Sequence, residues 1–335
     1  MSKVGVIINP MAGRDVRRIV GDAEYVTNFF KINVAKRFIQ GLDNIGVDEV
    51  IMMPDNCGIS EALVEDLKDK ISADLNFLDM KPVGDVRDTI IAASLLSKLK
   101  VDIIAGFGGD GTLRAIFKGA GRVKLVGVPL GTNNVLSRIQ VEPTVLGMLV
   151  GLSLKGKLYD VFVPMKILKF IVNGKIVDVA LIDMAFIARG TVGAKALWDI
   201  DDMLFIVYSK CEPTDVGLAS IGGQLYPSSL RDDYGLIVKL HGKSRTVNAI
   251  IVPGLVKRIS VESFTLLRMG EEFILPEDIY VVAFDGEREY VSSPGDEVKV
   301  VLERSGPLLF DASAAINEYI HFLKLEKKYG REFYG

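Results

Sequence analysis

The first half of the chain alternates short apolar runs with segments in which apolar residues recur at helical spacing. The short runs, which are typical of buried parallel strands, lie at residues 4–8, 49–53, 76–80, 101–107 and 124–129. Helical spacing occurs between and after them, at residues 28–42, 60–71, 85–99 and 145–154, with Ser60 as the expected cap of the second helix. Strands that alternate with helices predict an α/β fold with a doubly wound, Rossmann-like parallel sheet.

The pattern changes after residue 156. From residue 159 to residue 300 the chain carries short runs in which apolar and polar positions alternate, and Asn173-Gly174 is a strong signal for a two-residue hairpin turn. This predicts a second, mostly β domain over residues 157–306, after a first domain over residues 1–156. Residues 312–328 again show helical spacing and predict an amphipathic helix.

Composition limits the classes of function. The chain has 335 residues, 49% of them apolar and 25% charged, which is typical of a globular protein of two ordinary domains. A formal net charge of −3 without any run of Lys or Arg argues against nucleic acid as a partner. The few cysteines and histidines disfavour a disulfide framework, a His-rich metal site and His-dependent hydrolysis. No signal peptide or membrane-spanning stretch is recognisable, so we expect a soluble protein in the reducing cytoplasm.

The strand expected at residues 101–107 ends in a glycine-rich loop, Gly108-Gly109-Asp110-Gly111-Thr112, that opens a helix. The glycines allow positive φ and close backbone approach, and the bare N–H groups at the start of the helix favour an anion such as a phosphate. Asp110 repels phosphate unless its carboxylate binds a metal ion or accepts a proton from an attacking hydroxyl. The loop thus indicates chemistry as well as binding. A plain strand-to-helix turn with a surface aspartate is the alternative.

Two further loops are expected at the same edge of the sheet. Residues 9–13, Asn-Pro-Met-Ala-Gly, follow the first strand, and Leu-Gly-Thr-Asn-Asn follows the strand at residues 124–129. The carboxyl ends of parallel strands meet at one edge, so these loops should form a single crevice. Thr132 and Asn133 offer hydroxyl and amide groups for phosphate or ribose, while Asn134 is also suited to cap a helix at residues 135–137. Both roles are compatible.

Taken in order, these motifs resemble the superfamily of NAD kinases and diacylglycerol kinases. GGDGT is the signature that NAD kinases, diacylglycerol kinases and sphingoid-base kinases share. NPMAG resembles the opening of both the lipid kinases and predicted ATP- or polyphosphate-dependent NAD kinases of archaea and bacteria, and GTNN is most similar to the form in these NAD kinases. The resemblance implies a nucleotide-binding first domain, a β-sandwich as the second domain with the site between them, and residues 307–335 packing back on the first domain. It also implies self-association into a homo-oligomer.

The second half carries further matches to the same superfamily. Asp183 occupies the acidic position of an Asn-Glu pair that contacts the nicotinamide-side nucleoside in NAD kinases, but Ile182 replaces the Asn. The alternative for Asp183 is a buried, hydrogen-bonded strand carboxylate. Residues 285–287, Asp-Gly-Glu, follow the DGE form of the lipid kinases, in which the Glu is a candidate base; taken alone they predict a hairpin with exposed acids. Residues 217–223 match only the trailing part of a glycine-rich loop of NAD kinases.

The resemblance implies an ATP-dependent kinase that phosphorylates NAD at the 2′-hydroxyl of the adenosine ribose. Asp110 is then the first candidate base and Glu287 the second, and Mg²⁺ is held mainly through the ATP phosphates rather than by a protein metal site. The residues expected to bind nucleotide and substrate are Asn9, Gly13, Gly108, Gly109, Gly111, Thr112, Thr132, Asn133, Asn134 and Asp183. Two alternatives remain: a kinase for another hydroxyl acceptor, either a lipid or a small polar metabolite, and a nucleotide-binding sensor without catalysis.

Overall fold

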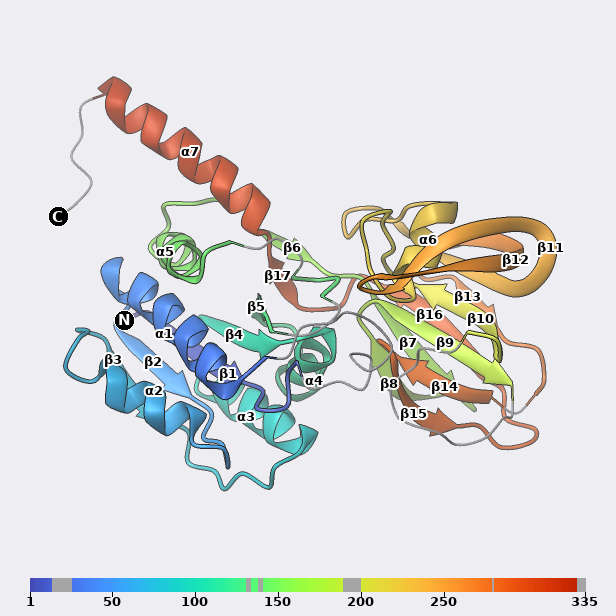
Figure 1. Cartoon of the computed structure of the whole chain (residues 1–335), viewed down its shortest axis with the longest axis horizontal. Coiled ribbons are helices and arrows are strands. Elements are labelled where there is room, and N and C mark those ends of the chain that lie inside the picture. The colour runs from blue at the N-terminus through green and yellow to red at the C-terminus, as the bar shows by residue number, and fades with distance from the viewer. Residues whose placement is uncertain (14–25, 131–133, 138–140, 189–199, 279, 330–335) are drawn as a thin grey trace.

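The computed structural model describes residues 1–13, 26–130, 134–137, 141–188, 200–278 and 280–329. Its first domain is built on a seven-stranded sheet in the order β3-β2-β1-β4-β5-β17-β6 (Figure 1). The strands are β1 (Lys3–Ile8), β2 (Glu49–Met52), β3 (Asp74–Phe77), β4 (Ile103–Gly108), β5 (Lys124–Pro129), β6 (Phe162–Pro164) and β17 (Leu308–Phe310). All pairings are parallel except that of β6 with β17. The second half of the chain thus contributes two strands to the sheet of the first.

Helices cover both faces of this sheet. They are α1 (Asn28–Asn44), α2 (Ile59–Leu67), α3 (Val86–Lys98), α4 (Asp110–Ala120) and α5 (Pro143–Leu154). Successive side chains of a strand point to opposite faces, so β1 serves two cores. Val6 packs in the core that contains Phe38 of α1, and Ile7 packs in the core that contains Leu96 of α3. The predicted doubly wound α/β architecture is confirmed.

Three local predictions differ from the structure. The second helix begins at Ile59, not Ser60, because the Asp55 carboxylate accepts the backbone N–H groups of both residues, at 3.2 and 2.8 Å. The strand predicted at residues 76–80 is β3, which begins two residues earlier. Residues 134–137 are not helical, so the alternative role of Asn134 as a helix cap is wrong.

The second domain is a β-sandwich, as predicted. A six-stranded sheet, β12-β11-β10-β9-β14-β15, faces a four-stranded sheet, β13-β16-β7-β8 (Figure 1). The strands are β7 (Ile167–Val172), β8 (Lys175–Ala180), β9 (Asp183–Ala188), β10 (Met203–Tyr208), β11 (Tyr234–Val252), β12 (Leu255–Arg268), β13 (Glu272–Ile274), β14 (Tyr280–Phe284), β15 (Glu287–Val291) and β16 (Val298–Glu303). Aromatic residues of both sheets, including Phe170, Phe186 and Phe284, form the core between them. The Asn173-Gly174 hairpin joins β7 to β8 with positive φ at both residues, 50° and 77°.

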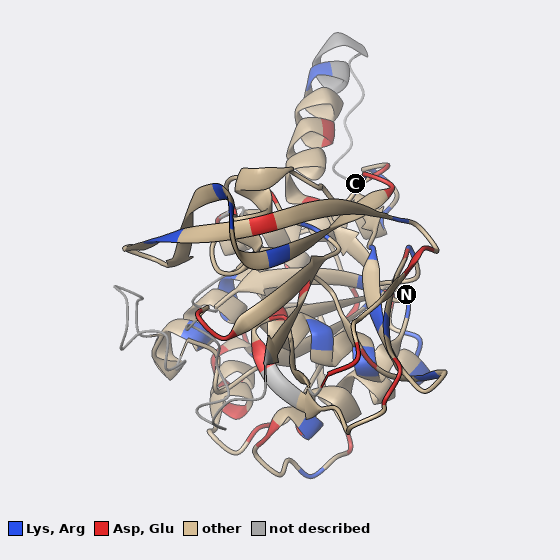
Figure 2. Cartoon of the chain, turned by 90° about the vertical axis from the view of Figure 1, so that its right-hand side faces the viewer, with Lys and Arg blue, Asp and Glu red and all other residues tan. Residues whose placement is uncertain are grey.

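Two features of the second half were not predicted. The short helix α6 (Ala219–Leu225) interrupts the strands, and β11 and β12 form a long hairpin that extends from the sandwich (Figure 1). Positively and negatively charged residues are interspersed along the chain in the view of Figure 2. Helix α7 (Ala312–Tyr329) follows β17; Ala315 is buried in the core shared with α1 and α5, and the far end of the helix extends away from both domains (Figure 1). Among the described residues, no helix is both long and apolar enough to cross a bilayer.

Candidate functional site

The loops that follow β1, β4 and β5 meet at one edge of the seven-stranded sheet. The Asn9 side-chain amide donates to the Thr112 hydroxyl at 2.9 Å, which joins the first loop to the second. The Leu130 N–H donates to the Gly108 carbonyl at 3.1 Å, which joins the third loop to the second. Gly13 adopts a φ of +69°, and a Cβ there would lie 3.0 Å from the Leu130 carbonyl oxygen. The predicted meeting of the loops is confirmed up to residue 130, whereas Thr132 and Asn133 lie outside the described residues.

The amino end of α4 is open to an anion. Gly109 is its N-cap and has no side chain to accept from the first N–H groups of the helix. The next residues, Asp110 and Gly111, form the first turn, where N–H groups have no partner within the helix. Gly108 is required by packing, since a Cβ there would lie 2.2 Å from the Thr112 hydroxyl oxygen. Uncapped N–H groups and the helix dipole together suit a phosphate.

A buried lysine lies under the first loop, and sequence reasoning missed it. Lys31 of α1 is fully buried and its ammonium group donates to the Pro10 carbonyl oxygen. The residue precedes Val34, Ala35 and Phe38 on the buried face of the helix. A lysine in an apolar stripe is costly to bury without a partner, and this position was the available signal in the sequence. The hydrogen bond to Pro10 ties the loop at residues 9–13 to α1.

Asp110 faces the protein interior rather than the mouth of the crevice. The residue is 8% exposed, and its two carboxylate oxygens accept the backbone N–H groups of Val135 and Leu136 at 2.8 and 3.0 Å. Burial, helped by the nearby Asp285, raises the pKa of Asp110 to about 7, although the two backbone hydrogen bonds and Lys210 oppose the rise. The carboxylate therefore holds the segment after residue 134 against the start of α4.

Glu287 reaches the same helix end from the second domain. It is exposed, and its Oε1 lies 3.3 Å from where a Cβ on Gly111 would be. Only a residue without a side chain leaves this space between α4 and β15. The structure thus brings both candidate bases to one place, and it gives them different surroundings: Asp110 is enclosed by backbone amides and Glu287 is open to solvent.

The Asp285-Gly286 pair forms the tight turn between β14 and β15, with φ values of +49° and +84°. The predicted hairpin is confirmed, but Asp285 is not an exposed acid: its side chain is fully buried. Its carboxylate accepts the N–H groups of Leu181, Ile182 and Asp183 at 3.0, 2.8 and 3.2 Å. Burial raises the pKa of Asp285, and the Arg114 guanidinium opposes that rise. The Asp285 side chain therefore anchors the turn between β14 and β15 to the start of β9. This turn also carries Glu287.

Arg114 joins the two halves of the site, and sequence reasoning did not identify it. It extends from α4 with a side chain only 5% exposed, donates to the Val179 carbonyl at 2.7 Å and pairs with Asp178 at 2.9 Å. Its guanidinium carbon lies 4.9 Å from the centre of the Phe284 ring, and Nε lies 4.0 Å from Asp285. These contacts fix the helix of the GGDGT loop to the sandwich, and hence to Glu287.

The remaining predicted residues have structural surroundings of their own. Asp183 is the first residue of β9 and is buried. Its backbone carbonyl accepts the Asp285 N–H at 3.0 Å, and in the strand register it lies opposite Tyr208 of β10. Ile182, in the position of the expected Asn, is buried. Asn134 is half-buried. Residues 219–223, which resemble the trailing part of a glycine-rich loop, lie in α6.

Within the part of the chain that the structure describes, no group of three or more His, Cys, Asp or Glu side chains could hold a metal ion. Asp110 and Glu287 are the acidic side chains at this edge, and both oxygens of Asp110 already accept hydrogen bonds. The described residues therefore fit a Mg²⁺ ion only when the phosphates of a bound nucleotide supply most of its ligands.

Comparison with known protein families agrees with this arrangement. Residues 57–152 match the diacylglycerol kinase catalytic domain, and residues 166–305 match the acetoin catabolism protein X C-terminal domain. The first match includes the GGDGT loop, so this part of the chain is similar to a diacylglycerol kinase catalytic domain. Acetoin catabolism protein X of Cupriavidus necator is 32% identical over 327 residues, which cover 93% of this chain and 91% of that protein. The chain belongs to the family of acetoin catabolism protein X.

Solved structures with a related arrangement come from Bacillus anthracis. A protein provisionally assigned as a diacylglycerol kinase has a TM-score of 0.48 and 15% identity, and covers 92% of this chain and 97% of its own. A diacylglycerol kinase from the same organism has a TM-score of 0.45 and 17% identity, with the same two coverages.

Proposed function

We propose that this protein is an ATP-dependent kinase that transfers the terminal phosphoryl group to the hydroxyl of a small acceptor. The observation that carries the proposal is the position of the Glu287 carboxylate, 3.3 Å from the site of a Cβ on Gly111, over the uncapped end of α4. Phosphoryl transfer depends mainly on holding donor and acceptor in line and on neutralising charge. An anion site with a carboxylate facing it meets both needs.

The residues of the site have separate roles in this proposal. The loop at residues 9–13 and the first turn of α4 hold the donor phosphates. A Mg²⁺ ion bound with ATP would be held mainly by the phosphates and would supply positive charge to the transferring group. Glu287 accepts the proton of the acceptor hydroxyl, because its carboxylate is exposed while that of Asp110 is enclosed. Asp110 is a positioning residue: it holds residues 135 and 136, and through them the loop that follows β5.

Two candidates for the phosphoryl acceptor can be compared. A small hydroxyl compound is favoured, and the relative named for acetoin catabolism makes the hydroxyketone acetoin a direct choice for testing. NAD is the second candidate, supported by a carboxylate at position 183 that lies beside the Asp285 turn. The apolar Ile182 weighs against NAD, because its side chain cannot replace the hydrogen bonds of an Asn.

The test is acceptor-dependent transfer of labelled phosphate from ATP–Mg²⁺, or from polyphosphate as an alternative donor, with acetoin, NAD and dispersed diacylglycerol offered separately. We expect one acceptor to be phosphorylated by the wild type. Glu262→Gln, which changes an exposed carboxylate on β12, is the control for Glu287→Gln and should transfer phosphate as the wild type does. NADP as the product would establish the NAD kinase function. If ATP binds but no acceptor is phosphorylated, the protein is a nucleotide sensor and the kinase proposal fails.

A further inference from the structure

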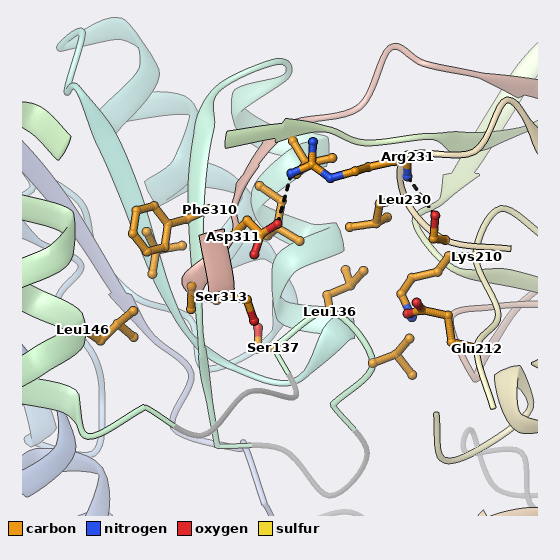
Figure 3. A pocket seen from close by; sticks show the side chains of 17 residues that line it. Leu136, Ser137, Leu146, Lys210, Glu212, Leu230, Arg231, Phe310, Asp311 and Ser313 are labelled. Atoms are coloured by element: carbon orange, nitrogen blue, oxygen red, sulfur yellow. Dashed lines mark hydrogen bonds and ion pairs between the residues drawn. The ribbon is translucent and has the colours of Figure 1, made fainter. Parts of the chain in front are cut away.

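A cavity of about 290 Å³ lies behind the segment that holds Asp110 (Figure 3). It spans the junction of the two domains, between β5, β17 and the start of α7 on one side and residues 210–212 and 229–231 on the other. Neither the loops at residues 9–13 and 108–112 nor Glu287 contributes to its lining. Its size is near the lower end for small-molecule pockets, which occur preferentially between domains.

The walls of the cavity combine apolar side chains with hydroxyl and charged groups. The aliphatic and aromatic side chains come from the sheet, from α5 and from the loop after β5, and include Leu136, Leu146, Val163, Leu230, Leu309 and Phe310. Hydroxyl groups are added by Ser137, Ser229 and Ser313, and Figure 3 shows Ser137 and Ser313 next to one another. This combination suits a short aliphatic body that carries hydroxyl or carbonyl groups.

The charged side chains of the lining already have partners. The Lys210 ammonium contacts Asp215 at 2.8 Å and Glu212 at 2.8 Å, and Arg231 pairs with Asp311 at 3.2 Å. A charged ligand at buried Lys210 would have to displace Asp215 or Glu212 and leave it unpaired, which is unfavourable, whereas the Arg231 side chain is 64% exposed. The lining therefore favours a neutral ligand over a phosphate or a carboxylate.

The cavity shares a wall with the proposed catalytic site. Val135 and Leu136 line it, while their backbone N–H groups hold the Asp110 carboxylate. The next residue, Ser137, packs so closely over β5 that a Cβ on Gly127 would lie 1.8 Å from its hydroxyl oxygen. A ligand that packs against this segment would restrict its movement, and with it the position of Asp110.

We propose that this cavity is a second binding site, for a small neutral alcohol or ketone with a short aliphatic chain, and that its ligand stabilises residues 135–137. The inference stands on the cavity and the hydrogen bonds of Asp110, so it is independent of the proposed kinase activity. The site differs from the anion site on the other side of the segment in both ligand charge and location.

Hexane-1,2-diol is the probe, because it joins a short alkyl chain to two neutral hydroxyl groups. Binding is measured by isothermal titration calorimetry and by hydrogen–deuterium exchange of the peptide that covers residues 135–137. We expect saturable binding in the millimolar range, as for a ligand of this size, and at least threefold slower exchange in this peptide. Hexanoate, which has the same chain length and a negative charge, should bind at least tenfold more weakly.

Two variants on α7 locate the binding. Ser313→Phe places a ring at the cavity, and Asn317→Phe places the same ring one turn further along the same helix, outside the lining. Loss of diol binding in Ser313→Phe alone is the expected result. The proposal is overturned if the diol does not bind the wild type, if both variants bind it equally, or if hexanoate binds as well as the diol. Displacement of the diol by ATP–Mg²⁺ would also overturn it, because the cavity would then belong to the nucleotide site.

Discussion

The two acidic turns of the site, Gly108–Thr112 and 285–287, use an Asp-Gly pair in the same way. In each, the aspartate is buried and accepts N–H groups from a distant segment, and burial raises its pKa. They differ in what they present to the crevice. The first turn offers the bare start of a helix, and the second offers the exposed carboxylate of Glu287. The comparison indicates that the aspartates hold the site together while the groups beside them meet the ligands.

Removing the link between the turns should have the largest effect on stability. Arg114→Met leaves Asp178 without its more buried partner and Asp285 without the guanidinium beside it. We expect the free energy of unfolding to fall by about 3–5 kcal/mol, as for other buried ion pairs that lose one member. Urea denaturation checks this. The control is Lys118→Met, which removes the more exposed partner of Asp178 and should cost less than about 1 kcal/mol. Equal costs would show that Arg114 is not a buried clamp.

The pH dependence of stability tests the buried state of Asp110. Its raised pKa means that the folded state keeps a proton that the unfolded state releases, so stability should fall as pH rises from about 4 to about 7. Asp110→Asn removes this contribution, which is on the order of 2–4 kcal/mol for a shift of this size. Because Asp285 is one of the groups that raise the pKa of Asp110, the difference between the two proteins includes the loss of this coupling as well as of the Asp110 carboxyl group. Chemical denaturation at several pH values measures it, and parallel curves for the two proteins would contradict the account.

The contact between the loops that follow β1 and β4 should contribute less to the free energy of unfolding. Asn9→Ala loses the hydrogen bond to Thr112 and the one from Met11, so a cost of about 1–2 kcal/mol is expected. Because the loop also holds the donor phosphates, the dissociation constant of ATP–Mg²⁺ should rise. Asn76→Ala is the control, since its amide bonds Glu49 at an exposed position on β3. Calorimetric titration with ATP–Mg²⁺ should find nucleotide binding unchanged in that control.

Gly111→Ala should have the smallest effect on stability while it disturbs the site. The change in the free energy of unfolding should stay within about 1 kcal/mol, because alanine is the better helix former. The new methyl group would lie 3.3 Å from Glu287 Oε1 and would displace that side chain. We therefore expect a lower rate of phosphoryl transfer in a protein that unfolds like the wild type. Unchanged transfer would separate Glu287 from the reaction.

The sequence predicted the order of elements and the meeting of the loops because these depend on local patterns. Apolar runs, helical spacing and glycine-rich turns each act over a few residues, and parallel strands bring their ends together. The surroundings of Asp110 could not be predicted in the same way. They depend on N–H groups from residues 135 and 136, a segment that follows another strand.

The side chains that join the two domains could not be predicted from the sequence either. Arg114 has the position of an ordinary polar residue in a helix, and its partners on β8 and β14 become neighbours only when the sandwich packs against α4. The burial of Asp285 has the same cause, since a tight turn in isolation exposes its acids. Lys31 is the exception, because its place in an apolar stripe was visible in the sequence.

The most direct test of the account compares Glu287→Gln with the wild type. Transfer of labelled terminal phosphate from ATP–Mg²⁺ to the acceptor is measured together with the dissociation constant of ATP. The account predicts that Glu287→Gln binds ATP as the wild type does and transfers phosphate about 10²–10⁴-fold more slowly, the range expected for loss of a general base. Transfer by Glu287→Gln at the rate of the wild type would contradict the assignment of Glu287 as the base.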